Sequence, residues 1–467
     1  MRKRIRCEAR RPGVRVDGRA GGRGAREAVV ALLAALATAL GASSSAQAAS
    51  FQAPCVAGTT APSCSYWMAR TTFVADGDTI RVIVDGERGE KTIRFTGINA
   101  MELWRYSENP AHRRGACMGL EATALVDRSI KASHGIVRLS AQDPGSRSGK
   151  RLRRSVEARV DGRWQDLGRL ELEQGLALWL PNGTEWAHNR EYNALAEQAA
   201  TARRNLYDPA ACAGAPSADA QLAVDVNWDA DGNDEQNLNG EWVDVRNLGS
   251  TDVPLAGWWL RDSWLRPSAP HIPGFVFPSY AVVRAGGSVR LHAGCGENSP
   301  NTPDRFFWCQ EDSVFENVTG KGDVGDGGYL FDPRGNLRAS MIYPCVDACS
   351  DPLQGQVQLS VHPTAPESIS VTNTAAGPID LAGHVVKLHL DGERSRFIWG
   401  YPFGPGSVLA PGETVQVHID GSPSDDTRLE RHLGRGPYRL TDGGNVVSLR
   451  SLTDVVVACA DWGDARC

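Results

Sequence analysis

Alternation of hydrophobic and polar residues dominates residues 66–208 and predicts several short strands. Ile80, Val82 and Val84 recur at every second position, and a second alternating run covers Thr92–Ile98. Further strands are expected at 136–139 and 156–160. Together with the helical patterns between and after these strands, this order favours a small barrel with packed helices.

Three segments show the apolar spacing of amphipathic helices. In 119–132, Leu120, Ala124 and Ile130 are expected on the apolar side. The second helix covers 167–174 and ends before Gly175, a residue type that often follows a helix. The third is expected to run from 186 to 206.

The C-terminal half contains an internal repeat. Three pairs of segments match at a fixed offset of 126 residues: Glu241–Asn247 with Glu367–Asn373, Leu255–Gly257 with Leu381–Gly383, and Gly286–His292 with Gly412–His418. A fourth pair, Asp326–Gly328 with Asp442–Gly444, has an offset ten residues smaller, which a loop deletion would explain. Short strands between Gly, Pro and Asn turns predict two β-sandwiches, at 220–350 and 351–467.

The N-terminal 48 residues read as a secretory signal peptide rather than as part of the fold. A basic stretch precedes an apolar run from Ala28 to Leu40, and a small-residue site ends at Ala48. Thirteen apolar residues are too few to span a bilayer, which needs about 20. We therefore expect a secreted, extracellular protein without a transmembrane segment, and a linker at 49–65.

The cysteines fit an exported protein. Ten remain after the signal segment, and no CxxC pair suggests a metal site, so disulfides are favoured. We expect pairing between near neighbours, including a Cys55–Cys64 loop. Cys117 and Cys212 are expected to pair as the two cysteines of the segment 66–212.

Charge is distributed unevenly along the chain, whose formal net charge is −5. Residues 66–208 hold 22 basic and 19 acidic residues, whereas the C-terminal part is strongly acidic. A mildly basic domain can approach nucleic acid, and an acidic one repels it. The two halves are therefore expected to have different roles.

Candidate chemistry is concentrated in Val74–Ile80 and Thr92–Glu102. Asp78 opens one strand, Arg94 lies in the next, and Asn99 and Glu102 follow its end. Carboxylate and amide oxygens suit Ca²⁺, arginine suits phosphate, and a carboxylate beyond the metal could activate water. The alternative is ordinary: a turn at Asp-Gly-Asp, a surface ion pair at Arg94 and a solvated Glu102.

These motifs resemble the staphylococcal-nuclease (thermonuclease) family over about residues 66–212. The similar strings are DGDTIRV, TIRFTGINAMEL, the helix with GxEA, QGLA, and NLYDP, in the family's order. The resemblance implies an OB-fold barrel and Ca²⁺-dependent hydrolysis of DNA and RNA by endonuclease or exonuclease cleavage. By position it makes Asp78 and the Ala100 carbonyl calcium ligands, Arg94 a phosphate ligand and Glu102 the general base.

The match departs from the family at two places. Asn99 stands where the family usually has Asp, so Asn99 offers calcium an oxygen without a charge. The second phosphate-binding arginine falls within Gly149–Arg154, where Arg151 and Arg153 are both candidates. One alternative alignment places Lys150 there.

The segment from Asn239 to Trp259 resembles a lamin tail domain, and the second repeat resembles it more weakly. The resemblance implies non-catalytic, immunoglobulin-like sandwiches. Trp258, Trp259 and Trp264 are expected in the core rather than on a binding face. The acidic loop Asp229–Asp234 looks like a calcium loop but lacks the spacing of an EF-hand.

The preferred interpretation is a secreted, monomeric, calcium-dependent nuclease whose sandwiches serve targeting or adhesion. The alternative is a nuclease-fold binding protein that has lost activity and attaches to a surface or polymer. We also expect a fragment covering about 49–213 to fold and cleave nucleic acid by itself.

Overall fold

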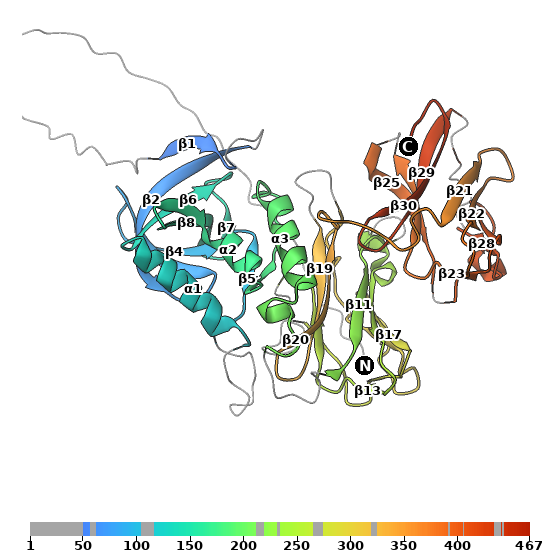
Figure 1. The fold of residues 1–467 in the computed structure, drawn as a ribbon, viewed down its shortest axis with the longest axis horizontal. Helices are drawn as coiled ribbons and strands as arrows, with labels where there is room; N and C mark the ends of the chain where they lie inside the picture. The colour runs from blue at the N-terminus through green and yellow to red at the C-terminus, as the bar shows by residue number, and fades with distance from the viewer. Residues whose placement is uncertain are drawn as a thin grey trace, which may run out of the picture. The chain divides into compact units, whose positions relative to one another are not determined.

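The computed structural model describes residues 50–56, 62–103, 116–211, 219–230, 234–264, 274–318, 325–390, 393–404, 406–433, 440 and 443–467. The fold is mainly β, with 41% of residues in strands, 13% helical and three α-helices in this part of the chain. Residues 46–467 form one compact unit by their contacts, and its elements are labelled in Figure 1.

A closed five-stranded barrel forms the N-terminal part. Its strands follow the order β2 (Ser63–Val74), β3 (Thr79–Val84), β4 (Glu90–Phe95), β8 (Arg151–Val160) and β6 (Ile136–Ala141), and pairing of β6 with β2 closes it. The short strands β7 (Arg147–Ser148) and β9 (Arg163–Asp166) pair with β8. The predicted alternation has its physical basis here, since Ile80, Val82 and Ile93 are fully buried.

The expected linker at 49–65 instead contains structure. Strand β1 (Phe51–Pro54) pairs with β2, and Cys55 and Cys64 form the expected disulfide at a Cα–Cα distance of 4.9 Å. This part of the chain is therefore a hairpin at the edge of the barrel sheet.

Helix α1 (Gly119–Ala132) has the predicted bounds, and Ile130 is buried as predicted, but Leu120 and Ala124 do not lie on the buried face. Its buried residues are Gly119, Ala122, Leu125, Val126, Ser129 and Ile130. Leu120 is 71% exposed, because it lies about 160° around the helix from Ala122. Figure 1 shows α1 lying against the barrel strands, and contacts with β2 and β8 agree.

The two later helices are shorter than the sequence pattern predicts. Helix α2 covers Leu167–Glu173, and Asp166 caps it by accepting a hydrogen bond from the Arg169 amide at 3.0 Å. Helix α3 covers Asn189–Thr201, whereas 186–206 was predicted. Arg203 takes a positive φ angle of 49° two residues after the helix ends, and a 3₁₀ turn follows at Asn205–Tyr207.

A tight turn separates β4 from β5 (Ile98–Ala100), which pairs with β10 (Ala177–Trp179). Gly97 forms this turn with a φ of 78°, and a Cβ atom there would lie 2.6 Å from the Tyr192 ring. A larger residue at 97 would therefore displace the strand that carries Asn99 and Ala100.

Two β-sandwiches with one strand order follow the barrel. The first sandwich (219–344) contains the sheets β11-β12-β17-β18, β13-β16 and β15-β14-β19-β20. The second sandwich (351–467) contains the corresponding sheets β21-β22-β27-β28, β23-β26 and β25-β24-β29-β30. In both, the last pair of the first sheet is parallel and the other pairs of the two four-stranded sheets are antiparallel.

The strand bounds of the first sandwich are β11 (Leu222–Asn227), β12 (Trp242–Asn247), β13 (Val253–Pro254), β14 (Trp259–Arg261), β15 (Phe275–Val276), β16 (Val282–Val283), β17 (Ser288–His292), β18 (Arg305–Phe307), β19 (Asp326–Phe331) and β20 (Leu337–Tyr343). Those of the second are β21 (Val357–His362), β22 (Ser368–Asn373), β23 (Ile379–Asp380), β24 (Val385–Leu390), β25 (Glu393–Pro402), β26 (Val408–Leu409), β27 (Thr414–His418), β28 (Glu430–His432), β29 (Gly444–Arg450) and β30 (Val456–Gly463). Strands β12 and β22 lie 126 residues apart, as do β17 and β27, so the predicted repeat is a repeat of structure.

The repeated motif residues are structural. Asn247 donates hydrogen bonds to the carbonyls of Thr251 and Val283, and Asn373 donates to the equivalent carbonyls of Gly377 and Leu409. Glu241 and Glu367 likewise each accept a backbone N–H bond, from Val314 and Leu440 respectively. These buried groups fix loops in both copies, because an unpaired polar group in a core is costly.

The fourth sequence match has a different register in the sheets. Tyr329 of β19 pairs with Arg261, and Ser448 of β29 pairs with Lys387, which is 126 residues beyond Arg261. The offset along these strands is therefore 119 residues, and Asp326 corresponds to Asn445. The similarity of Asp326–Gly328 to Asp442–Gly444 does not mark equivalent positions.

The barrel core continues into the first sandwich. Tyr329, Phe331, Leu337 and Ile342 belong to the same cluster of buried apolar residues as the barrel strands and helices. All six residues of β19 are buried, because one face meets this cluster and the other faces the sandwich core. A fragment ending near 213 would expose this apolar surface, which argues against the expected independence of the barrel.

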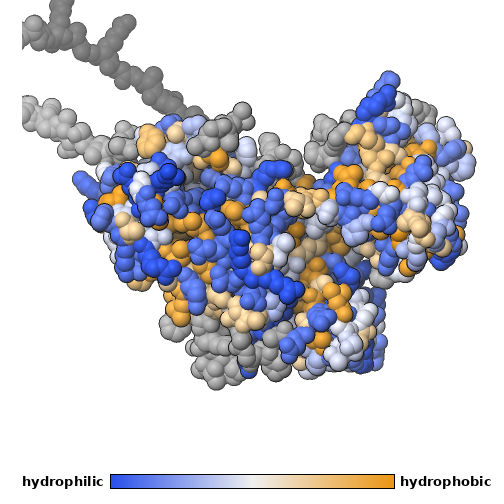
Figure 2. All heavy atoms as spheres, in the orientation of Figure 1, coloured by the Kyte–Doolittle hydropathy of each residue, from blue (hydrophilic) through white to orange (hydrophobic). Residues whose placement is uncertain are grey.

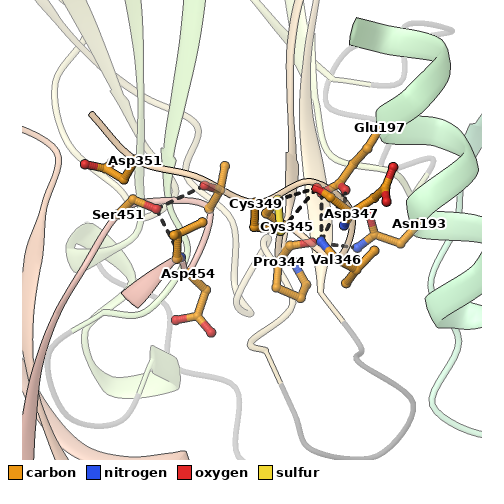
Figure 3. The surroundings of a disulfide bond; sticks show 12 residues. Asn193, Glu197, Pro344, Cys345, Val346, Asp347, Cys349, Asp351, Ser451 and Asp454 are labelled. Carbon is orange, nitrogen blue, oxygen red and sulfur yellow. Dashed lines mark hydrogen bonds between the residues drawn. A yellow bond between two sulfur atoms is a disulfide. The ribbon is translucent and has the colours of Figure 1, made fainter. Parts of the chain in front are cut away.

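The segment between the two sandwiches contains a disulfide between Cys345 and Cys349, which are four residues apart. Figure 3 shows this Cys345–Cys349 bond beside Asn193 and Glu197 of α3. The Asn193 amide donates to the Pro344 carbonyl at 2.8 Å, and Glu197 accepts N–H bonds from Val346 and Asp347 at 3.1–3.3 Å. Helix α3 is thereby joined to the segment that leads into the second sandwich.

Four disulfides occur among the described residues, all between near neighbours as predicted: Cys55–Cys64, Cys295–Cys309, Cys345–Cys349 and Cys459–Cys467. Cys117 is also disulfide-bonded, but its predicted partner Cys212 lies outside the described residues. These bonds are consistent with an extracellular protein. The predicted signal peptide also lies outside the described residues.

No helix within the described ranges is long and apolar enough to cross a membrane. Figure 2 shows one face of the molecule, on which hydrophilic residues surround smaller hydrophobic patches.

Candidate functional site

The predicted site residues lie on neighbouring barrel strands. Thr79 of β3 pairs with Arg94 of β4, and Arg94 pairs with Arg153 of the parallel strand β8. Asp78 precedes Thr79 directly, so a carboxylate and two guanidinium groups originate from three adjacent strands. The pairing of β4 with β3 and β8 thus brings together residues that are up to 75 positions apart in the sequence.

Asp78 is the centre of a buried polar network and is only 3% exposed. Its Oδ2 atom accepts a hydrogen bond from the Ala100 amide at 2.9 Å and forms an ion pair with Arg94 Nη1. Its Oδ1 atom accepts a bond from the Thr79 hydroxyl at 2.9 Å. The strands β3, β4 and β5 are thus held together around one carboxylate.

Arg94 connects the predicted phosphate and metal positions. Its Nη2 atom donates to the Asn99 side-chain oxygen at 3.2 Å, while Nη1 contacts Asp78. Burial lowers the pKa of this guanidinium to about 10, and the nearby positive charge of Arg151 acts in the same direction. Arg94 still carries its charge at neutral pH.

Arg151 and Arg153 lie on the same face of β8, two residues apart, and both flank Arg94 electrostatically. Arg151 donates to the Thr79 hydroxyl at 3.2 Å and so reaches the residue next to Asp78. Arg153 pairs in register with Arg94, and burial lowers the pKa of its guanidinium. Both candidates for the second phosphate ligand therefore border the site, and Lys150 is exposed at the β7–β8 hairpin.

Glu102 follows β5 and is partly exposed. Its negative charge acts on Arg94, and its main-chain carbonyl accepts a hydrogen bond from the Ala116 amide at 2.8 Å. The carboxylate of Glu102 is thus near the guanidinium beside which phosphate would lie. Residues 104–115, which follow, lie outside the described residues.

Sequence reasoning did not select Glu171 of α2, a fully buried carboxylate. Neither of its oxygens has a hydrogen-bond partner among the described residues. Burial raises its pKa well above the ordinary value, and the charge of Asp76 adds to this shift. Its Oε1 atom faces Gly77, where a Cβ atom would lie 3.2 Å away. Helical spacing from Leu167 and Gly168 offered the signal, since it places Glu171 on the buried face.

The first sandwich also reaches the site, which the sequence gave no reason to expect. The side-chain amide of Asn99 donates a hydrogen bond to the main-chain carbonyl of Ser263 at 3.2 Å. The guanidinium carbon of Arg153 lies 5.8 Å from the centroid of a Trp264 ring, within cation–π range. Trp258 is buried in the sandwich core, as expected, and Trp259 stacks on Phe331.

The oxygen atoms at the candidate site are of the kinds that bind a hard cation such as Ca²⁺. Asp78, Asn99 and the Ala100 carbonyl are the predicted ligands, and the unpartnered Glu171 adds a buried carboxylate nearby. Among the described residues, no group of three or more His, Cys, Asp or Glu residues forms a metal cluster. A cation here would therefore rely on amide and carbonyl oxygens as well as on carboxylates.

The acidic loop Asp229–Asp234 falls partly outside the described residues, since 231–233 are not among them. Asp229 forms an ion pair with Lys387 of the second sandwich at 2.6 Å. Asp234 accepts a hydrogen bond from Asn317 at 2.6 Å, and burial raises its pKa to about 6. Both flanking carboxylates thus have protein partners.

Comparison with family models matches residues 218–344 to the lamin tail domain. The first sandwich is thereby a lamin tail domain, which is immunoglobulin-like. A comparison of the chain with curated proteins found no match. The match covers the first sandwich and does not include the barrel. The barrel is therefore described by its strand order and by the residues of the candidate site.

Proposed function

We propose that the barrel is a calcium-dependent phosphodiester hydrolase that acts on DNA, RNA or both. The observation that carries the proposal is the placement of Asp78 directly before β3 and of Arg94 and Arg153 on the adjacent strands β4 and β8, with the charge of Glu102 acting on Arg94. A carboxylate, two phosphate-binding guanidinium groups and a partly exposed carboxylate are the parts that phosphodiester hydrolysis requires. The similarity of these motifs to the staphylococcal-nuclease family supports the same conclusion.

In this proposal, Arg94 and either Arg151 or Arg153 bind the phosphate and stabilise the negative charge that develops in the transition state. Glu102 accepts a proton from the attacking water. It is a partly exposed carboxylate whose charge acts on Arg94, as Asp76 also is, and the family resemblance places the general base at its position. Asp78 positions Arg94 and the Ala100 amide through its two oxygens.

Calcium would be held by Asp78, Asn99 and the Ala100 carbonyl, and it would supply charge that polarises the phosphate. Asn99 carries no charge, so affinity is expected to be in the weak range of calcium sites, about 10⁻⁴–10⁻³ M. The lamin tail domain and the second sandwich are non-catalytic in this proposal and serve targeting or adhesion.

The residue roles are tested by comparing Glu102→Gln, Arg94→Gln, Arg151→Gln and Arg153→Gln. The first two should lower kcat about a hundredfold or more, as losses of general bases and charge-stabilising groups do. Of Arg151 and Arg153, the one that binds phosphate should show the larger loss. Arg163→Gln, an exposed arginine on β9, is the matched control. Full activity in Glu102→Gln would rule out its role as general base.

A nuclease-fold binding protein without activity is the second candidate function. The observation in its favour is that Arg94 contacts both Asp78 and Asn99. The predicted phosphate-binding residue is therefore already paired with two of the predicted metal ligands. This candidate predicts that oligonucleotide binds and that no variant or metal produces cleavage. The hydrolysis assays therefore separate the two functions.

A further inference from the structure

A cavity lies in the barrel, and none of the predicted catalytic or metal-binding residues lines it. It has a volume of about 510 Å³ and is lined from β2, β6, β8, the β3–β4 hairpin and the β7–β8 hairpin. On β8, Leu152 and Arg154 line this cavity, whereas Arg151 and Arg153 face the candidate site. One strand therefore presents cations to two separate places, because successive side chains point to opposite faces.

The floor of this cavity is apolar. Trp67, Val84, Leu139 and Leu152 form it, and Val84 and Leu139 are buried in the barrel core. Trp67 is half-buried, and the Arg154 guanidinium carbon lies 4.8 Å from the centroid of a ring of its indole. A planar, weakly polar group of the size of a nucleobase suits such a floor.

The lining of the cavity carries more cations than carboxylates: Lys91, Arg147, Lys150 and Arg154 against Glu87 and Glu90. Arg147 and Lys150 are exposed on the β7–β8 hairpin, and within the described ranges neither forms an ion pair. The two acidic residues of the lining have other partners: Glu87 pairs with Lys91 at 3.4 Å, and Glu90 pairs with Arg81 at 3.3 Å.

Arg154 adds a buried charge to this lining. It is 5% exposed, and its N–H groups bond to the carbonyls of Pro144 and Arg153, both at 2.7 Å. Carbonyl partners orient the guanidinium without neutralising it. Burial lowers its pKa, and the charge of Arg147 acts in the same direction, whereas the charges of Glu185, Asp143 and Glu87 act in the opposite direction. Arg154 therefore lies near Arg147 and also near carboxylates.

We propose that this cavity binds one nucleotide of the nucleic-acid strand whose scissile phosphate lies at Arg94, with the base against Trp67 and the phosphate at Arg147 and Lys150. The inference rests on the proposed function for its ligand. The volume of the cavity falls within the range of small-molecule binding sites, and such sites occur at the mouths of barrels. Binding there would hold the strand on both sides of β8 and fix its register relative to Glu102.

The test measures binding of the full chain to a fluorescent single-stranded oligonucleotide of about 12 nucleotides, within the span of an OB-type site. Chelator is present, so that hydrolysis does not interfere. The double variant Arg147→Gln/Lys150→Gln should bind about tenfold more weakly at low salt. The slope of log K against log salt should fall by about 1.4, or about 0.7 for each lost phosphate contact.

Two controls make the result specific. Arg128→Gln removes an exposed cation from α1 that does not line the cavity, and should change neither the affinity nor the slope by more than about a third of the effect. Inorganic polyphosphate of equal charge should bind more weakly than the oligonucleotide, since it has no base for the Trp67 floor. Equal binding of polyphosphate would overturn the nucleotide assignment, and an unchanged slope in the double variant would overturn the site.

Failure of this inference is distinguishable from failure of the proposed function. If the wild-type chain cleaves with calcium, the double variant should show a raised KM with kcat unchanged. If the chain cleaves and the double variant binds and cleaves like wild type, the cavity is no subsite and the function stands. If the chain never cleaves and the double variant loses oligonucleotide binding, the cavity stands and the hydrolase proposal fails.

Discussion

The first and second sandwiches have the same strand order but differ on the outer face of one sheet. In the first, Tyr329 and Phe331 of β19 belong to the barrel's core cluster, and the rings of Trp259 and Phe331 stack with centroids 4.2 Å apart. By sheet register, the second sandwich has Ser448 and Arg450 at these positions. Ser448 bonds to His389, and Arg450 forms an ion pair with Asp454 at 2.7 Å.

The difference shows what the duplication preserved and what it left free to change. The buried Asn and Glu residues that fix the loops are the same in both copies, because the sandwich needs them wherever it is placed. The outer face is apolar in the copy that covers the barrel and polar in the other. The first copy has its own core and also contributes one sheet face to the core of the barrel, whereas the core cluster of the second copy consists of its own residues in the described part of the chain.

The largest expected effect comes from the face that the copies do not share. Phe331→Ala should lower the free energy of unfolding by about 3–5 kcal/mol, because it removes a fully buried ring and leaves a cavity in the shared core. Urea unfolding followed by tryptophan fluorescence and by circular dichroism measures this loss. Ser448→Ala, at the position equivalent to Tyr329, is the control and should cost about 1 kcal/mol. A loss below about 1 kcal/mol in Phe331→Ala would show that the barrel does not depend on the first sandwich.

A smaller effect is expected where the first sandwich meets the candidate site. Trp264→Ala should raise hydrolysis about two- to fivefold at limiting substrate, because Arg153 would then no longer give up a cation–π contact worth about 0.5–1 kcal/mol when it binds phosphate. The rate is measured with the full chain and compared with Trp308→Phe, a tryptophan inside the same sandwich. A fall in rate would show instead that Trp264 helps to bind substrate.

The smallest expected effect is a pH dependence at the junction of α3 with the Cys345–Cys349 segment. Burial raises the pKa of Glu197 to about 7, although the amides of Val346 and Asp347 favour its charged form. The native protein therefore keeps a proton that the unfolded chain releases near the ordinary value of 4.5. The stability from this group is complete below pH 4.5 and is lost as the pH rises through about 7.

Glu197→Gln should remove this dependence while keeping an acceptor for the two amides. Between about pH 5 and pH 8, wild type should lose about 1 kcal/mol more stability than the variant, a modest figure because the carboxylate is partly exposed. Thermal unfolding at several pH values measures the difference. Parallel pH profiles for the two proteins would show that Glu197 does not titrate in this range.

Several features were predictable because they depend on local pattern. Alternation located the barrel strands, and the offset of 126 residues located the duplicated sandwiches. The face of α1 was assigned wrongly, because the apolar character of Leu120 was given more weight than its position around the helix. The buried face is the one formed by Ala122, Leu125, Val126 and Ser129, which have helical spacing in the sequence.

The rest depended on contacts that no local pattern encodes. Ser263 meets Asn99 across 164 positions of sequence, and the order of strands in the barrel alone does not bring them together. Helix α3 ends at Thr201, and Arg203, the first residue after it with a positive φ angle, is not a residue type that favours this conformation. The site residues on β3, β4 and β8 were predictable as a group, since adjacent strands of a barrel share a rim, whereas Glu171 required the packing of α2 to become visible.

The central claim is that the barrel hydrolyses phosphodiester bonds with calcium. The most direct measurement is the cleavage rate of single-stranded DNA and RNA by the purified full chain, during calcium titration up to about 10 mM and with excess chelator. We predict cleavage that saturates in the millimolar range, disappears with chelator and needs less calcium in Asn99→Asp, which restores a charged ligand. Cleavage that persists unchanged in chelator would contradict the calcium mechanism. The absence of cleavage at every calcium concentration, with oligonucleotide still bound, would contradict the assignment as an enzyme.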